Sequence, residues 1–292
     1  MGRMLIADSP LAEAGRQYLD AQDAATWTGL LRPGFHLREY VAGEEVVGYL
    51  GGNPFLPEDA EWPVWEGHGP LTFVAAVDCG SLPVKDLDLP LPESGALLFF
   101  YFDGQADEGE ATVGYWEPET TIGGARVLYV PADAEMAERE APEPITAYPR
   151  FLLGGDVIAT EPDPEHTAFV AAFGDPYDPE STHGALVGDA FSNALDEIGS
   201  ALAPHHQIGG YARPTQGRVE SEAAYAVHGG NSPEDDEARA DLAAGLVLLA
   251  QLDTDDRAGM SWGDAGTLYW LIHPDDLRTQ HFDAAMFTWQ SH

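Results

Sequence analysis

The chain of 292 residues contains 44% hydrophobic residues, so it can form a sizeable core, and at ~100–200 residues per domain it suggests two structural units, separate or fused. It carries 50 acidic and 13 basic residues, a formal net charge of −37, and Lys85 is its only lysine. Nucleic acid and anionic membranes are therefore disfavoured as partners, because both are bound through clusters of Lys and Arg.

Targeting signals and the cysteine content further limit the class of protein. The first apolar run, Met4 to Ala7, is shorter than the ~7–15 residues of a signal-peptide core, and no later run approaches the ~18 residues of a membrane span. Cys79 is the only cysteine, which excludes an internal disulfide and favours a buried structural thiol. We therefore expect a cytoplasmic protein.

Helices are predicted at the start of the chain and again in its second half. Ser9 and Pro10 have the residue types of an N-cap and a first helical turn, so a helix begins there. A second short helix is predicted at about residues 24–31. Two later helices are predicted at about residues 185–202 and from Ser232-Pro233 to near Gly245.

Short apolar, aromatic-rich runs bounded by Gly, Pro and Asp are typical of buried strands. Six such runs occur at residues 71–78, 96–102, 125–130, 245–253, 267–272 and 285–290. They predict a mainly β fold with peripheral helices (α+β). The predicted organisation is a helical segment 1–34, a first β unit 35–160, a connection 161–184 and a second β unit 185–292, fused into one domain.

Self-comparison indicates an internal duplication. Residues 49–52 (YLGG) precede a strand that ends at Asp78, and a loop then leads to Gly95 and the next strand. Residues 207–210 (QIGG) precede a strand that ends at Asp253, and a loop leads to Gly266. The predicted fold is therefore two internally repeated β units.

The loop after Asp253 contains a Gly-x-Ser-x-Gly pattern centred on Ser261, which is the pattern of a hydrolase nucleophile elbow. An elbow requires a helix after the serine, whereas a strand-like run follows here. The predicted structure is instead a glycine-rich hairpin. A hydrolase or cation-dependent enzyme that uses Asp253, Asp255, Ser261 and Asp264 stays the alternative hypothesis.

The same loop spaces its aspartates like part of a calcium-binding loop. Asp253, Asp255 and Asp264 occupy the first, third and twelfth positions, but Arg257 and Ala258 replace required residues. The aspartates are therefore candidate ligands for a divalent cation, against the simpler interpretation that they accept backbone hydrogen bonds in the turn. No other cofactor is expected. The candidate ligand-binding residues are Asp253, Asp255, Trp262, Asp264 and Gln251, with the carboxylates expected to face solvent.

Three segments in order, residues 50–63, 206–216 and 248–277, resemble the YwqG-like family of bacterial proteins of unknown function. The resemblance spans about residues 35–290 and implies one compact, mostly β, internally repeated fold with no established reaction or cofactor. It also suggests an immunity-like or partner-binding role. Ala76 departs from the pattern, which has Gln at this position, as Gln251 does in the second repeat.

Two hypotheses for the function therefore remain: the chain is a binding protein without catalytic activity, or it is an enzyme built on the aspartate loop. A binding protein needs only a rigid scaffold and a charge bias, and the excess acid favours a basic protein partner. The oligomeric state is not indicated by the sequence. We expect the binding function.

We predict that added salt raises the melting temperature, because screening weakens the repulsion among the acidic residues; the Debye length falls from ~30 Å at 0.01 M to ~3 Å at 1 M. A calorimetric series in salt, with and without calcium, measures this. A flat series would mean that the acidic residues are paired or far apart, and an additional rise with calcium would indicate a cation site.

Overall fold

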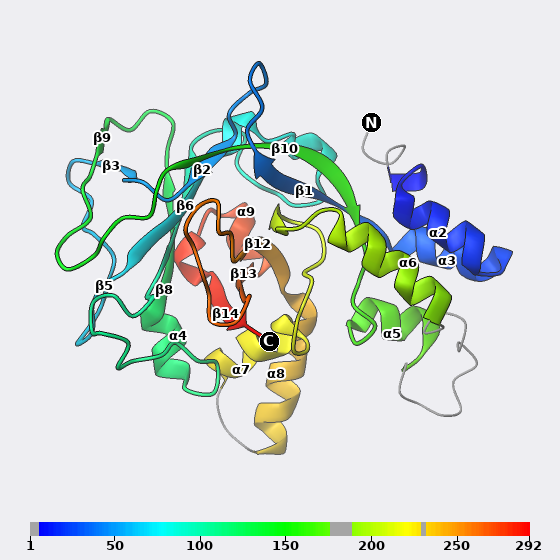
Figure 1. The fold of residues 1–292 in the computed structure, drawn as a ribbon. Helices are drawn as coiled ribbons and strands as arrows, with labels where there is room; N and C mark the ends of the chain where they lie inside the picture. The colour runs from blue at the N-terminus through cyan, green and yellow to red at the C-terminus, as the bar shows by residue number, and fades with distance from the viewer. Residues whose placement is uncertain (1–5, 176–188, 229–231) are drawn as a thin grey trace.

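The computed structural model describes residues 6–175, 189–228 and 232–292, and its main feature is one ten-stranded antiparallel sheet (Figure 1). The strands are arranged in the order β14-β13-β12-β11-β1-β10-β2-β6-β7-β8. Their bounds are Arg32–Glu39 (β1), Gly48–Leu50 (β2), Thr72–Asp78 (β6), Ala96–Tyr101 (β7), Ala125–Val130 (β8), Phe151–Thr160 (β10), His206–Ile208 (β11), Val247–Asp253 (β12), Thr267–Ile272 (β13) and Met286–Gln290 (β14).

The sheet curls until its two ends face each other. Phe99 of β7 packs against Trp270 of β13, with ring centroids 5.1 Å apart, and Tyr101 packs at the same distance against Phe287 of β14. These rings are buried, and they occupy the interior of the main hydrophobic core. Core side chains thus fill the space on the inner face of the sheet, so binding sites must lie on its outer face or in its loops.

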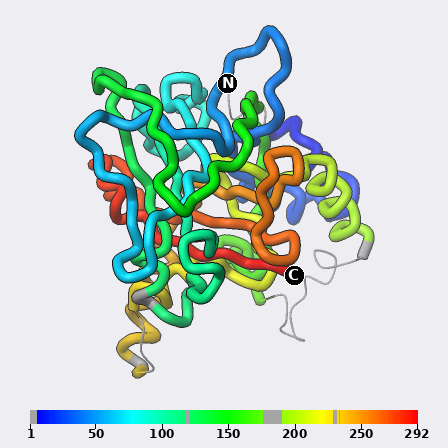
Figure 2. Tube along the Cα trace, turned by 60° about the vertical axis from the view of Figure 1, so that its left-hand side comes forward, coloured from blue at the N-terminus to red at the C-terminus, as the bar shows by residue number. Residues whose placement is uncertain are grey.

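Helices cover two separate parts of the outer face (Figures 1 and 2). One group packs beside β1 and β10, and the other covers β13 and β14, with α8 projecting from the body of the molecule. The α-helices are Pro10–Tyr18 (α2), Ala21–Leu30 (α3), Pro118–Gly124 (α4), Thr167–Phe173 (α5), Asp189–Ser200 (α6), Val219–Val227 (α7), Pro233–Gly245 (α8) and Pro274–Arg278 (α9). The 3-10 turns are Cys79–Ser81 (η1), Val84–Asp86 (η2) and Phe282–Ala284 (η3).

Two small two-stranded sheets complete the described structure beside β6, β7 and β8. One joins β3 to β9 and the other joins β4 to β5. Their bounds are Phe55–Pro57 (β3), Val64–Trp65 (β4), Gly69–Pro70 (β5) and Met136–Glu138 (β9). The segments that carry them partly cover the outer face of the first half, where the Trp62 ring packs against the Phe100 ring at a centroid distance of 5.5 Å.

The two sets of strands on either side of the central β1–β10 pair show the same irregularity in their pairing. The pairing of β6 with β7 is interrupted between Phe73 and Ala75, and the pairing of β12 with β13 is interrupted between Leu248 and Ala250. Both β2 and β11 are followed by two glycines with positive φ. Their φ angles are 58° and 69° at Gly51 and Gly52, and 66° and 71° at Gly209 and Gly210.

Close packing adds a reason for the glycines. A Cβ atom on Gly51 would lie 2.4 Å from the Pro149 carbonyl oxygen, and one on Gly210 would lie 2.6 Å from Thr160 Oγ1. Both the φ angle and the approach therefore require glycine. These shared features accord with the internal duplication, which stays a prediction.

The mainly β, α+β fold predicted from the sequence is confirmed, and all six predicted strands are present with small shifts at their ends. The N-cap at Ser9 is also confirmed, because its side chain accepts a hydrogen bond from Ala12 N at 3.2 Å. The helix predicted at residues 185–202 is present as α6, while residues 185–188 lie outside the described residues.

The two central strands were missed. In β10 the glycines Gly154 and Gly155 interrupt the apolar pattern, because neighbouring side chains cross the strand there. A Cβ atom on Gly155 would lie 2.4 Å from the ring of Phe35. The predicted connection 161–184 also contains α5, and its residues from 176 onward lie outside the described residues.

In the described parts of the chain no helix is long and apolar enough to cross a membrane. Cys79 is buried, as its neighbours indicated, and burial raises the pKa of its thiol to about 12. It is therefore a packing residue at neutral pH.

We predict that Phe99→Ala lowers the free energy of unfolding by about 3–5 kcal/mol, because it leaves a cavity between the two ends of the sheet. Urea unfolding measures the loss. Val41→Ala is the matched control, since Val41 is 60% exposed and its truncation should change stability by less than about 0.5 kcal/mol. Equal effects of the two changes would contradict the packing described for this core.

Candidate functional site

The sequence-predicted site lies in the hairpin that joins β12 to β13. Asp255 N donates to the Met260 carbonyl and Met260 N donates to the Asp255 carbonyl, which closes a tight turn. Gly259 and Gly263 both have positive φ, 68° and 60°. The glycine-rich hairpin is thus confirmed, and β13 rather than a helix follows Ser261.

Asp253 is tied to the segment that leads into β11. Its Oδ2 accepts a hydrogen bond from His205 N at 2.6 Å and lies 3.0 Å from His205 Nδ1, while Oδ1 accepts from Thr267 Oγ1 at 2.7 Å. Burial alone would raise the pKa of Asp253, but these hydrogen bonds outweigh it and hold the pKa below the ordinary value of 3.8. The carboxylate therefore acts as an ionised tie between two strands.

Asp255 is more deeply enclosed, with 2% of its surface exposed. Its Oδ2 lies 3.2 Å from His206 Nε2 and accepts from Arg257 at 2.7 Å, and its Oδ1 accepts from Arg257 N and Nε, each at 2.9 Å. Burial would raise the pKa of Asp255, but the bonds from His206 and Arg257 outweigh it and lower the pKa. Little lone-pair capacity is left for another ligand.

Gln251 and Trp262 are buried as well. Gln251 Oε1 accepts from Arg213 N at 2.9 Å, and its Nε2 donates to the His205 carbonyl at 3.0 Å. The Trp262 ring packs edge-on against Tyr101 and Tyr148 in the core, with centroids 5.8 and 5.9 Å apart. Neither side chain is available at the surface.

Asp264 and Ser261 are exposed and stand apart from these pairs. The Asp264 carbonyl accepts from His292 N at 3.0 Å, and Ser261 Oγ donates to the Gly263 carbonyl at 3.4 Å. Among the residues that the structure describes, no three His, Cys, Asp or Glu side chains are grouped to hold a metal ion. The hairpin thus presents neither a nucleophile–base pair nor a cation cage in its described residues.

The expectation that the loop carboxylates face solvent is wrong for Asp253 and Asp255. The two carboxylates are enclosed because they face two histidines. His205 directly precedes β11, and His206 is the first residue of β11. His206 of this pair is 1% exposed. Because β11 pairs with β12, the aspartates act as structural ties. This pairing could not be predicted from the sequence.

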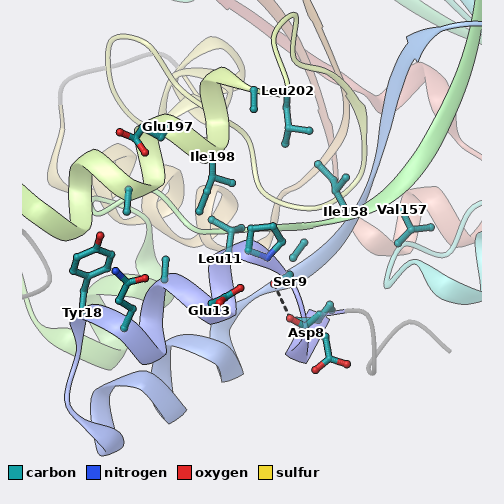
Figure 3. Close-up of a pocket in the computed structure, with 17 residues that line it drawn as sticks. Asp8, Ser9, Leu11, Glu13, Tyr18, Val157, Ile158, Glu197, Ile198 and Leu202 are labelled. Atoms are coloured by element: carbon teal, nitrogen blue, oxygen red, sulfur yellow. Dashed lines mark hydrogen bonds between the residues drawn. The ribbon is translucent and has the colours of Figure 1, made fainter.

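A pocket of about 730 Å³ lies between α2, α6 and β10 (Figure 3). Its walls are mainly apolar and come from all three elements. They include Leu11 and Ala14 of α2, Ile158 of β10, and Ile198 of α6 with Leu202 after it. The volume and the apolar lining are those of small-ligand and side-chain pockets, which span ~300–1,000 Å³.

Carboxylates give this helix pocket its electrostatic character. Asp8, Glu13 and Glu197 line it and are exposed, and no Lys or Arg stands among those of its lining residues that the structure describes. Tyr18 lines it as well and is 39% exposed. The pocket therefore suits an apolar group that carries or adjoins a positive charge. Sequence reasoning missed it because the three elements are distant along the chain.

A buried polar layer lies behind the pocket and is internally paired. Glu161 forms an ion pair with Arg213, at 3.2 Å between Oε1 and Nη1, and burial raises the pKa of Glu161 although Arg213 opposes the shift. His36 Nε2 lies 3.2 Å from the Pro204 carbonyl, and burial lowers its pKa. These groups link β1 and the end of β10 to the segments on either side of β11.

We predict that Asp255→Asn lowers the free energy of unfolding at pH 7 by about 3 kcal/mol, because it breaks a buried pair. The pKa of Asp255 is depressed in the folded state, so its contribution is present above the unfolded-state pKa of ~3.9 and is lost as pH falls below it. Urea unfolding between pH 7 and 3 should therefore show a shallower acid loss for the variant.

Asp256→Asn is the matched control, since Asp256 is the exposed neighbour in the same turn. Its stability and its pH dependence should follow those of the unmodified protein. Identical behaviour of the two variants would refute the structural role of the Asp255 carboxylate.

The comparisons with known proteins identify a family without an established activity. The family model described as a domain of unknown function (DUF1963) matches residues 49–291. This span contains the aspartate hairpin and most of the sheet, whereas α2 and β1 precede it. No curated protein matches the chain. The chain therefore belongs to the family of the domain of unknown function DUF1963.

Proposed function

We propose that this protein is a binding protein for a basic partner, and that the helix pocket between α2, α6 and β10 takes an apolar side chain of that partner. The observation that carries the proposal is the combination of an apolar wall with carboxylates as the charged groups among the described lining residues. An apolar anchor next to Lys or Arg satisfies both features of the pocket.

The charge of the whole chain supports the same conclusion. With a formal net charge of −37, the protein attracts cationic partners from a distance and can accelerate their encounter by ~10–10³-fold at low salt. The pocket then supplies the short-range contact that charge alone lacks. Each carboxylate at the rim adds to the local potential that steers the partner.

The proposal extends to three expectations from the sequence. It includes membership of the YwqG-like family, a cytoplasmic location, and an immunity-like role in which the basic partner is neutralised by binding. A rigid scaffold is what such a role needs, and the His–Asp ties supply it around β11 and β12.

A labelled amphipathic helical peptide of Leu and Lys tests the proposal by fluorescence anisotropy. We predict binding that weakens about tenfold in the variant Glu13→Gln/Glu197→Gln and that is lost on filling the pocket with Ala194→Phe. The control variant Glu234→Gln/Glu237→Gln removes the same charge from the exposed surface of α8 and should bind as the unmodified protein does.

The counterpart peptide of Leu and Glu separates charge from apolar contact, and it should not bind. Equal weakening by the pocket and control variants would reduce the effect to overall charge and would overturn the assignment of the pocket. Unchanged binding in Ala194→Phe would do the same, provided that its circular dichroism spectrum is unaltered.

A further inference from the structure

The two halves of the sheet carry different side chains at corresponding positions of their outer faces. In the second half these are Gln251, Tyr269 and Gln290, on β12, β13 and β14. The matching positions in the first half hold Ala76, Leu98 and Val130, on β6, β7 and β8. The pairings correspond, because Gln251 is opposite Tyr269 as Ala76 is opposite Leu98.

In the second half the three polar side chains fasten an irregular segment, residues 211–217, through its backbone. Gln251 Oε1 accepts from Arg213 N at 2.9 Å, and the Tyr269 hydroxyl donates to the Arg213 carbonyl at 2.7 Å. Gln290 Oε1 accepts from Thr215 N at 2.7 Å, and its Nε2 donates to the Gly217 carbonyl at 2.8 Å. This face is therefore covered by the chain itself.

In the first half the corresponding face is an open apolar groove of about 420 Å³. Ala76, Leu98 and Val130 form its floor and offer no side-chain hydrogen bond. The walls carry large apolar side chains that are partly in solvent, with exposed fractions of 39% for Val46 and 44% for Met136. Clustered exposure of this kind marks binding surfaces.

The edge of this sheet groove is acidic. Asp78 lines it, and Glu45, Asp133 and Glu135 are exposed and adjoin lining residues along the chain. A second copy of this strongly acidic protein would be repelled from such an edge. A chain segment with basic residues is attracted to it.

We propose that the sheet groove on β6, β7 and β8 docks an extended segment of a partner protein, with apolar side chains on the floor and Lys or Arg at the acidic edge. The second half shows that a non-helical segment fits a face of this register. Because the floor of the first half lacks polar anchors, side-chain burial rather than backbone hydrogen bonding holds the occupant. This site is separate from the helix pocket and does not depend on it.

The probe is a short synthetic peptide in which Leu and Lys alternate, with prolines that keep it extended, and titration calorimetry measures its affinity. We expect Val46→Ser/Met136→Ser to weaken binding about tenfold, since both side chains wall the groove. The control is Val41→Ser/Val64→Ser, which alters more exposed apolar side chains elsewhere, at 60% and 53% exposure.

Two further arms make the outcome decisive. Ala194→Phe, which fills the helix pocket, should leave binding of the extended peptide unchanged, so failure of one site is distinguishable from failure of the other. Hydrogen exchange should show protection of residues 46–49 and 130–136 by the peptide.

The proposal is overturned if the groove and control variants bind the peptide equally, or if an alternating Leu and Glu peptide binds as well as the Lys peptide. Self-association by sedimentation that disappears in Val46→Ser/Met136→Ser would assign the groove to a second copy of the chain and would also overturn it.

Discussion

The contact between the two ends of the curled sheet determines what the rest of the structure can do. Phe99 and Trp270 pack against each other across the interior, and Phe287 extends the same cluster, with its ring centroid 5.2 Å from that of Trp270. Aromatic pairs of this geometry contribute beyond their buried area. Because they occupy the inner face, binding sites are left to the loops and to the outer face, where helices cover two regions and leave the sheet groove open.

The aspartate hairpin shows how topology decides the role of a residue pattern. Taken alone, the acidic loop has the chemistry of a cation site or of an active-site edge. In the folded chain, Asp253 and Asp255 face His205 and His206, because β11 pairs with β12. A carboxylate that is already bonded to an imidazole and to backbone N–H groups has a structural role. The hairpin thereby gains rigidity, and these carboxylate oxygens are no longer free to bind a cation.

The sequence allowed the fold class, the outer strands and the first helix cap to be predicted, because apolar periodicity and capping are local signals. It did not allow the central pair to be predicted, since Gly154 and Gly155 hide β10. The close approach of Glu44 to Gly154 and of Phe35 to Gly155 is visible only in the folded chain. The helix pocket depends on α2 meeting α6, a contact between distant segments. The difference between Ala76 and Gln251 was visible in the sequence, whereas its consequence required the segment that Gln251 holds.

The distribution of charged residues is the feature that the two proposed sites share. Among the ion pairs of the described chain, Arg213 and Arg257 lie against the enclosed carboxylates of Glu161 and Asp255, where an unpaired charge would be most costly. Thirteen basic residues cannot neutralise fifty acidic ones, so most carboxylates remain in solvent, including those at the rims of the helix pocket and the sheet groove. Both rims surround apolar surface that the chain does not cover. A partner with Lys or Arg beside apolar side chains supplies the missing counter-charge and the missing contact together.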